Sequence, residues 1–393
     1  MSKKNKFKNE IVRFCTTIDG IRAYTPAYFE TYIKKAKLHK KIHEQVKSKY
    51  FIKKNKKLFI KTAGIEVMDK LRDSEAQFIE SVGLIPTSQY VTLFIVFENY
   101  IRQIIKASLS ENKTILIQTE NNISLNEILE FSTIKEVVNF SIEREVDDAL
   151  RDKKSIVDWI KENLKINVPN VNNLNDDFVK YNGIRNLLVH NNGKVNRIYL
   201  QNCLQAKFDK KDLPKIGDNV DVTPDLFLKT CSNLYLIGLQ IGINLWIHSK
   251  PKDIKLIENL LIDQQIKFLN KRKFYLAEIV SNMAISTIKT FSKIPIEENV
   301  LINKAASLKF QKKDNLSEQI LNNIHSKDIV FNLAICLINK NFKTASALMT
   351  KINKSKLQSY YINWPLFKLN RRSETLNKAF KKIVGKVSLY QIQ

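Results

Sequence analysis

The feature that most constrains the fold of this chain is its shortage of residues that interrupt helices. Only 9 glycines and 8 prolines occur among 393 residues, while Lys, Leu, Ile, Glu and Asn are abundant. Gly and Pro mark turns and end regular elements, and Leu, Lys and Glu favour helices. Apolar residues make up 44% of the chain, which excludes a disordered protein. We therefore expect an all-α protein, with one short β-like run at 114–118.

The basic residues gather at the two ends of the chain. Residues 1–60 carry 17 basic and 4 acidic side chains, residues 61–249 carry 22 and 25, and residues 250–393 carry 26 and 10. Two strongly positive ends around a slightly acidic middle are typical of a protein that holds a polyanion such as nucleic acid. The alternative is that the lysines simply cover solvated surfaces.

The length and the charge pattern predict three regions. These are a basic helical N-terminal region at 1–75, a central helical domain at 76–250 and a basic C-terminal helical domain at 251–393. The last helices of the third region resemble helical hairpins stacked in sequence. They do not recur with a fixed period, so the sequence does not indicate a repeat family.

Local signals place the first helices of the central domain. One helix is expected over 64–82, a break at 83–88 around Pro86, and a long helix over 89–109. Two capping boxes follow, formed by Ser124 with Glu127 and by Thr133 with Glu136.

Aromatic side chains precede the lysine-rich run of the N-terminal region. They are Tyr24, Tyr28, Phe29 and Tyr32, and the run of lysines continues to Lys57. Basic groups beside aromatic faces suit single-stranded nucleic acid. An amphipathic helix that packs its aromatic residues on the protein body is an equal alternative.

The most apolar segment is 226–248. Its polar members, Lys229, Asn233, Gln240 and Asn244, fall on one narrow stripe of a helix. The apolar part is too short and too interrupted to span a bilayer. We expect a buried central helix or a subunit interface, and no membrane role.

No metal site or leader sequence is evident. Four cysteines, Cys15, Cys203, Cys231 and Cys336, lack metal-binding spacing, so reduced thiols in a cytoplasmic protein are expected. His39 and His43 are four residues apart, but they have no third ligand nearby. The N-terminus has no apolar core behind its charges, so we expect no signal peptide there. No cofactor is expected.

The most informative motif lies in the segment 181–193, Tyr-Asn-Gly-Ile-Arg-Asn-Leu-Leu-Val-His-Asn-Asn-Gly. Arg185 is followed by Asn186 and, after three apolar residues, by His190. The closing Asn-Asn-Gly is a helix-ending signal. The motif therefore places an arginine and a histidine near the C-terminal end of one helix.

These residue types suit RNA cleavage without a metal. When the 2′-hydroxyl attacks the adjacent phosphorus, the reaction needs a base, an acid and positive charge on the phosphorane. His190 can act as acid or base near neutral pH. The guanidinium of Arg185 is permanently charged, and its paired N–H donors match the spacing of phosphate oxygens. The alternative is that both are helix-end cations that stabilise free carbonyls.

The set Arg185-Asn186…His190 resembles the hallmark of the HEPN superfamily of helical ribonucleases and nucleotide-binding proteins. The resemblance extends more loosely over 76–250, where the early helix contains Glu98. With 11 arginines and 5 histidines in the chain, the bare spacing is a weak signal, and the surrounding helices strengthen it. The resemblance implies a HEPN-type helical bundle, ribonuclease activity and pairing of two domains whose motifs line one cleft.

Helix geometry limits how the motif can work. Positions five apart lie about 140° apart around a helix, so Arg185 and His190 do not share a face, whereas Asn186 and His190 do. Either the helix end unwinds near His190, or two copies of the motif face each other. The family resemblance implies the second arrangement. We expect a homodimer, with 226–248 as a candidate pairing surface.

Other residues are candidates for supporting roles. Asn186 would orient the imidazole or contact substrate. Tyr181 would stack on a base or only pack, and packing is the more common outcome. Glu98 and Arg102, four apart on the early helix, would pair with each other or with Arg185.

The resulting hypothesis is a metal-independent endoribonuclease that acts as a toxin or anti-phage defence effector. Its basic ends would hold RNA, with tRNA among the candidates, and an antitoxin or defence-system protein would be its partner. The defence role rests on family analogy alone. The alternatives are a non-catalytic HEPN module for nucleic-acid binding or assembly, and a helical scaffold in a larger complex.

Overall fold

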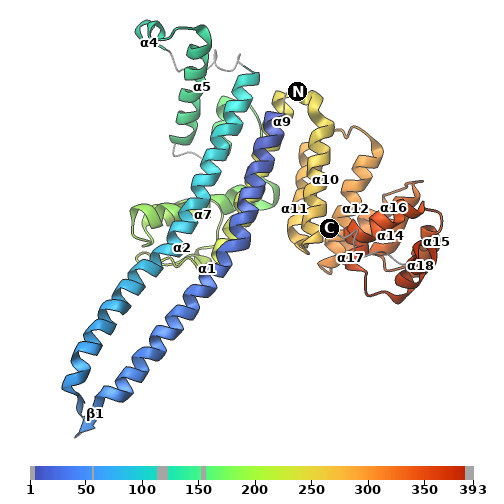
Figure 1. Ribbon diagram of the computed structural model, residues 1–393. Helices are drawn as coiled ribbons and strands as arrows, with labels where there is room; N and C mark the ends of the chain where they lie inside the picture. Colours follow the sequence, from blue (N-terminus) through green and yellow to red (C-terminus); the bar gives the residue numbers. More distant parts are fainter. Residues whose placement is uncertain (1–4, 55–56, 113–122, 152–155, 386–393) are drawn as a thin grey trace. The chain divides into compact units, whose positions relative to one another are not determined.

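The structure is a computed structural model that describes residues 5–54, 57–112, 123–151 and 156–385 (Figure 1). Within these ranges the chain is helical except for one two-stranded hairpin, so the all-α prediction is confirmed. The β-like run 114–118 lies outside the described residues. The chain divides into two units, Met1–Leu164 with Asn173–Gly242, and Lys165–Asn172 with Ile243–Gln393.

This division differs from the three expected regions. Residues 1–75 are not separate, because the first helix packs along the second within unit 1. The helices and strands of unit 1 are α1 (Lys6–Tyr50), β1 (Phe51–Lys54), β2 (Lys57–Ile60), α2 (Thr62–Glu111), α4 (Leu125–Leu129), α5 (Ile134–Arg151), α6 (Ile156–Asn163), α7 (Leu174–His190), α8 (Arg197–Gln205) and most of α9 (Pro224–Ser249).

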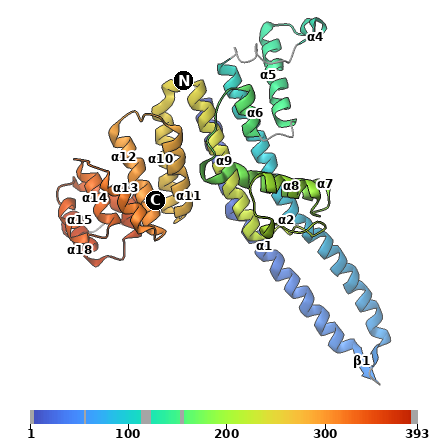
Figure 2. The same cartoon turned by 180° about the vertical axis from the view of Figure 1, so that it is seen from behind.

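The helices α1 and α2 lie side by side and run in opposite directions (Figures 1 and 2). The hairpin that joins them pairs Phe51 with Ile60 and Lys54 with Lys57. This hairpin was not predicted from the sequence, since its strands are four residues each and resemble a continuation of the helical pattern. The connection returns the chain along α1, which places both helices in one core.

The predicted break at 83–88 does not occur. Helix α2 runs without interruption from Thr62 to Glu111 with Pro86 inside it. A proline inside a helix removes one hydrogen bond and costs about 3 kcal/mol. Helix α2 packs along α1 (Figures 1 and 2), and burial of apolar side chains between the two helices is the term that can offset this cost. The capping box at Ser124 is confirmed, since the Ser124 side chain accepts from the Glu127 amide and the Glu127 carboxylate accepts from the Ser124 amide. Only half of the second box forms, because the Thr133 side chain accepts from the Glu136 amide but the Glu136 carboxylate accepts from the Ser132 amide.

Helix α9 is the buried centre of unit 1. Two glycines let α1 and α2 approach it closely. A Cβ added at Gly238 would lie 2.4 Å from the Phe14 ring, and one at Gly242 would lie 2.0 Å from the Tyr100 hydroxyl. The Tyr100 hydroxyl donates to the Gly238 carbonyl at 2.9 Å, and the Phe14 and Tyr100 rings stack with centroids 4.1 Å apart.

By length and composition, α9 is the one helix among the described residues that could cross a membrane, but 78% of its apolar window is buried inside the protein. The prediction of a buried central helix is therefore confirmed. The prediction that 226–248 forms a pairing surface is wrong, because residues of the same chain cover it. Asn233 on its polar stripe donates to the Leu174 carbonyl at 2.9 Å, and Thr230 bonds the Tyr90 hydroxyl at 3.2 Å.

Unit 2 is a series of helical hairpins. Its helices are α10 (Ile254–Asn270), α11 (Phe274–Thr287), α12 (Ile294–Phe310), α13 (Asp314–Asn322), α14 (Ile329–Ile338), α15 (Phe342–Met349), α16 (Lys354–Asn363), α17 (Pro365–Leu369) and α18 (Glu374–Val384). The first helices of successive hairpins, α10, α12 and α14, contact one another in turn, and α14 contacts α17. The prediction of stacked hairpins is thereby confirmed.

Three of the hairpin turns share a left-handed residue with a basic side chain. These residues are Arg272, Lys312 and Lys340, with φ of 54°, 64° and 57°. Their spacing is unequal, 40 residues and then 28 residues, which explains why the sequence shows no fixed period.

Candidate functional site

Helix α7 carries the predicted motif and is held in unit 1 by α2 and α8. It begins at Leu174, and its N-cap is Asn173 in a left-handed conformation. It ends at His190, as predicted, and the chain then turns through Asn192 and Gly193 with positive φ. The Gly193 amide donates back to the Leu187 carbonyl at 2.9 Å, so the end of the helix is closed by a backbone turn.

The predicted arginine lies between two acceptors. Arg185 Nη2 is 3.3 Å from Glu98 Oε1 on α2, and Arg185 Nη1 donates to Asn186 Oδ1 at 3.0 Å. The Nε atom is buried and has no hydrogen-bond partner among the described residues. A guanidinium has five N–H donors, so the two contacts fix its orientation and leave donors for a further acceptor.

The two charged residues predicted on the early helix have different partners. Glu98 pairs with Arg185, whereas Arg102 pairs with Asp147 on α5. They do not pair with each other, because their side chains reach different neighbouring helices. The Arg102–Asp147 pair joins α2 to α5 and takes no part in the arginine site.

Tyr181 belongs to the core. Its side chain is buried, and its carbonyl accepts a hydrogen bond from the Tyr90 hydroxyl at 3.0 Å. A base cannot stack on a ring that is covered by the protein. The packing alternative therefore holds for Tyr181, and the stacking alternative is wrong.

His190 is the last residue of α7 and is exposed. The helix is regular up to this point, so the alternative that the helix end unwinds near His190 does not hold. Arg185 and His190 therefore point about 140° apart around the helix axis, and one chain does not bring them together. Asn186 and His190 share one exposed face, and the neighbouring Val189 is 47% exposed.

The N-terminal aromatic residues are divided between core and surface. Phe29 is buried and packs on Phe227 of α9, with ring centroids 5.8 Å apart. Tyr24 is 73% exposed. The side chains of Tyr28 and Tyr32 lie outside the described residues. Several lysines follow along α1 with exposed side chains. They are Lys34, Lys35, Lys37, Lys40, Lys41, Lys47 and Lys49.

Metal-binding groups do not gather in the described part of the chain, where no cluster of three or more His, Cys, Asp or Glu side chains occurs. The His39 side chain lies outside the described residues. All four cysteines are thiols. Burial raises the pKa of the Cys203 thiol and of the Cys336 thiol, which makes both poor nucleophiles at neutral pH.

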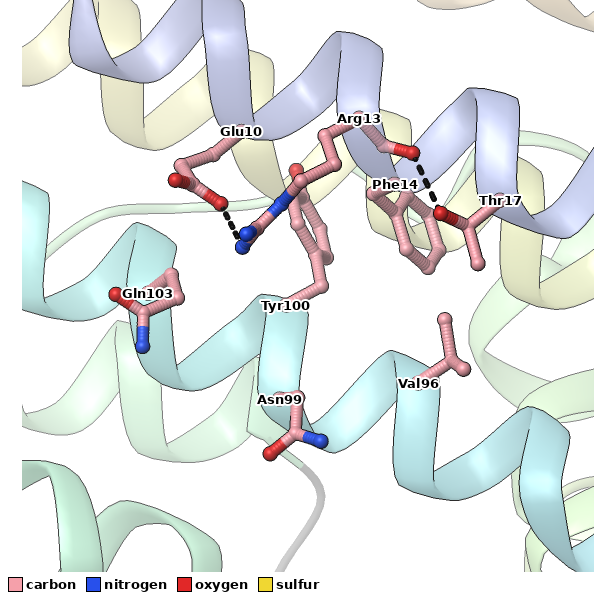
Figure 3. Close-up of a pocket in the computed structure, with 8 residues that line it drawn as sticks. All are labelled: Glu10, Arg13, Phe14, Thr17, Val96, Asn99, Tyr100 and Gln103. Atoms are coloured by element: carbon pink, nitrogen blue, oxygen red, sulfur yellow. Dashed lines mark hydrogen bonds and ion pairs between the residues drawn. The ribbon is translucent and has the colours of Figure 1, made fainter.

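A polar cavity between α1 and α2 was not expected from the sequence. It has a volume of about 430 Å³. In Figure 3, Glu10 and Arg13 of α1 point toward each other above Tyr100, and Asn99 and Gln103 of α2 lie across from them. Neither Arg185 nor His190 lines this cavity. Its charged pair is internally satisfied, so it offers amide groups rather than a free charge.

Comparison of the chain with protein-family models, with curated proteins and with solved structures finds no match.

Proposed function

We propose that the protein is a metal-independent endoribonuclease of the HEPN type that acts as a dimer. The observation that carries the proposal is the fixed guanidinium of Arg185, which Glu98 and Asn186 hold on the helix that ends at His190. An arginine oriented by a carboxylate on another helix is preorganised for an anion. A helix-end cation that only stabilised carbonyls would not need this support.

The proposed reaction uses only groups of the chain and of RNA. An imidazole removes the proton of the 2′-hydroxyl, whose oxygen attacks the adjacent phosphorus. The bond from phosphorus to the 5′ oxygen breaks, and that oxygen takes a proton from an acid. The products are a 2′,3′-cyclic phosphate and a 5′-hydroxyl. Arg185 stabilises the charge of the phosphorane.

The helix geometry supports the proposed dimer. Since Arg185 and His190 diverge on one α7, a second α7 must supply the complementary group. The exposed face with Asn186, Val189 and His190 replaces α9 as the proposed pairing surface. Two facing copies would place two imidazoles in one cleft, one as base and one as acid.

The proposed substrate is RNA bound by phosphate contacts, with tRNA among the candidates. The exposed lysines along α1 would supply such contacts, which do not depend on the nucleotide sequence of the RNA. A role as a toxin or anti-phage effector in the cytoplasm, with an antitoxin or defence-system partner, remains a proposal by analogy with the family.

The test is to incubate the purified protein with total RNA in the presence of a chelator. Cyclic phosphate ends are expected from the wild type. The His190→Ala variant should bind RNA with unchanged affinity and produce no such ends. Retained cleavage by this variant would refute the role of His190, and cleavage that the chelator abolishes would refute the metal-independent mechanism.

The second candidate function is a non-catalytic RNA-binding or assembly module. The observation that favours it is the separation of Arg185 from His190 within one chain, together with the ion pair that already occupies Arg185. On this hypothesis, the double variant Arg185→Ala/His190→Ala would bind RNA like the wild type, and neither protein would generate new RNA ends.

A further inference from the structure

A second cavity, in unit 2, is lined by two basic segments about 100 residues apart in sequence. It has a volume of about 500 Å³ and is lined by Leu269, Asn270, Arg272, Lys368, Leu369, Arg371 and Arg372. Contact between α10 and α17 brings the two segments together. Every lining residue belongs to unit 2, whereas Arg185 and His190 belong to unit 1.

The charge of this cavity has one sign. Four of its seven lining residues are cations and none is acidic. Within the part of the chain that the structure describes, no carboxylate forms an ion pair with any of the four. Converging like charges repel one another, so an anion with more than one charge would relieve the repulsion and bind favourably.

The backbone around the cavity is fixed by hydrogen bonds. The buried Asn370 side chain donates to the carbonyls of Leu337 at 3.2 Å and Leu366 at 2.9 Å. Arg371 Nη2 donates to the Ile362 carbonyl at 3.2 Å. These contacts hold the turn that carries two of the arginines, so the cationic side chains start from a rigid frame.

The lining indicates what kind of anion fits. Guanidinium groups match phosphate oxygens by paired N–H donors, and three of the four cations are arginines. The apolar wall consists of Leu269 and Leu369, and no aromatic ring lines the cavity on which a base would stack. A cavity of this size accommodates a small molecule. The cavity would therefore recognise the phosphate groups of a ligand rather than its bases.

We propose that the cavity bounded by Arg272, Lys368, Arg371 and Arg372 binds closely spaced phosphate groups. The source is either a compact polyphosphate, such as the phosphate chain of a nucleotide, or the phosphates of an RNA strand. This site is independent of the proposed nuclease centre, because no residue is shared.

The test compares two double variants with equal loss of charge. Arg272→Gln/Arg372→Gln removes two cations from the cavity. Lys312→Gln/Lys340→Gln removes two exposed cations of unit 2 that lie outside the cavity, at left-handed turn positions that correspond to that of Arg272. The probes are inorganic tripolyphosphate, measured by calorimetry, and a labelled 2′-O-methyl RNA of about 12 nucleotides, measured by anisotropy. The methylated RNA cannot be cleaved, so binding is read without nuclease activity.

The cavity variant should weaken tripolyphosphate binding by roughly 10–100-fold, the range for lost charge-assisted hydrogen bonds. The control variant should change it by no more than about twofold. Selective loss of RNA binding alone would support the cavity and identify RNA as the phosphate source. Equal effects of the two variants, or no binding of either probe, would overturn the proposal.

A third variant separates guanidinium recognition from charge. Arg272→Lys/Arg372→Lys keeps the net charge but removes the paired donors, so tripolyphosphate affinity should still fall. An unchanged affinity would show that binding depends on charge alone. It would overturn the assignment of a site in which guanidinium groups bind phosphate through paired donors. Circular dichroism of all three variants should match the wild type.

Discussion

Neutralising Glu98 tests whether this carboxylate positions Arg185. Arg185 Nη2 and Glu98 Oε1 are 3.3 Å apart, and at an effective dielectric constant of about 20 the Coulomb attraction is about 5 kcal/mol. The two side chains are 23% and 43% exposed. Solvent screening and lost side-chain entropy therefore reduce the net contribution to stability to about 1 kcal/mol or less. We expect Glu98→Gln to fold normally.

The effect of Glu98→Gln on RNA cleavage should be larger than its effect on stability. A neutral amide attracts the guanidinium less strongly than a carboxylate does, so Arg185 would occupy several orientations. A displacement of about 1 Å in a catalytic group can lower a rate about 100-fold. We expect single-turnover cleavage of a labelled RNA to slow by roughly 10–100-fold, with little change in RNA affinity.

Asp147→Asn is the matched control. It breaks the Arg102–Asp147 pair, whose side chains are 40% and 45% exposed, and it changes the net charge by the same amount. Its free energy of unfolding should fall by about as much as that of Glu98→Gln, while cleavage stays within about twofold of wild type. Equal slowing by both variants, or normal cleavage by Glu98→Gln, would refute a positioning role for Glu98.

Three further predictions follow from the packing and the chemistry. Gly242→Ala should lower the free energy of unfolding by about 1–3 kcal/mol, because its Cβ meets the Tyr100 hydroxyl, and Tyr100→Phe in the same chain should recover part of the loss in urea titrations. Mixing inactive Arg185→Ala and His190→Ala proteins should restore part of the cleavage if the site forms between chains, and no recovery would contradict the proposed dimer. Burial raises the pKa of Asp177, so the folded state holds this proton more tightly than the unfolded state. Stability should therefore fall as the pH rises from about 4 through the raised pKa, and urea titrations across this range should show a smaller fall for Asp177→Asn.

Local sequence signals predicted the elements that depend on local physics. The helix that ends at His190 follows from Asn191 and Gly193, which supply the cap and the left-handed turn. The burial of α9 follows from a composition that leaves one narrow polar stripe. These features need no knowledge of distant residues, because capping and helical periodicity act within a few turns.

Features that depend on distant contacts were not predictable in the same way. Pro86 is a strong local stop signal, but packing of α2 on α1 overrides it. Arg102 has Glu98 within reach on its own helix, yet its partner is Asp147 on α5. The cavity of unit 2 forms between two segments about 100 positions apart in sequence. The basic residues of one segment do not show which other segment will pack beside them.

The position of the motif on a regular helix decides what a single chain can do. A straight α7 turns Arg185 inward to Glu98 and leaves His190 on the exposed face with Asn186. Proton transfer in the proposed reaction needs two groups on opposite sides of one phosphodiester, and one chain offers a single imidazole there. In the proposed dimer, a twofold axis near Val189 would bring a second imidazole to the same substrate. The same helix that is too regular for a site within one chain is therefore well suited to a site shared by two.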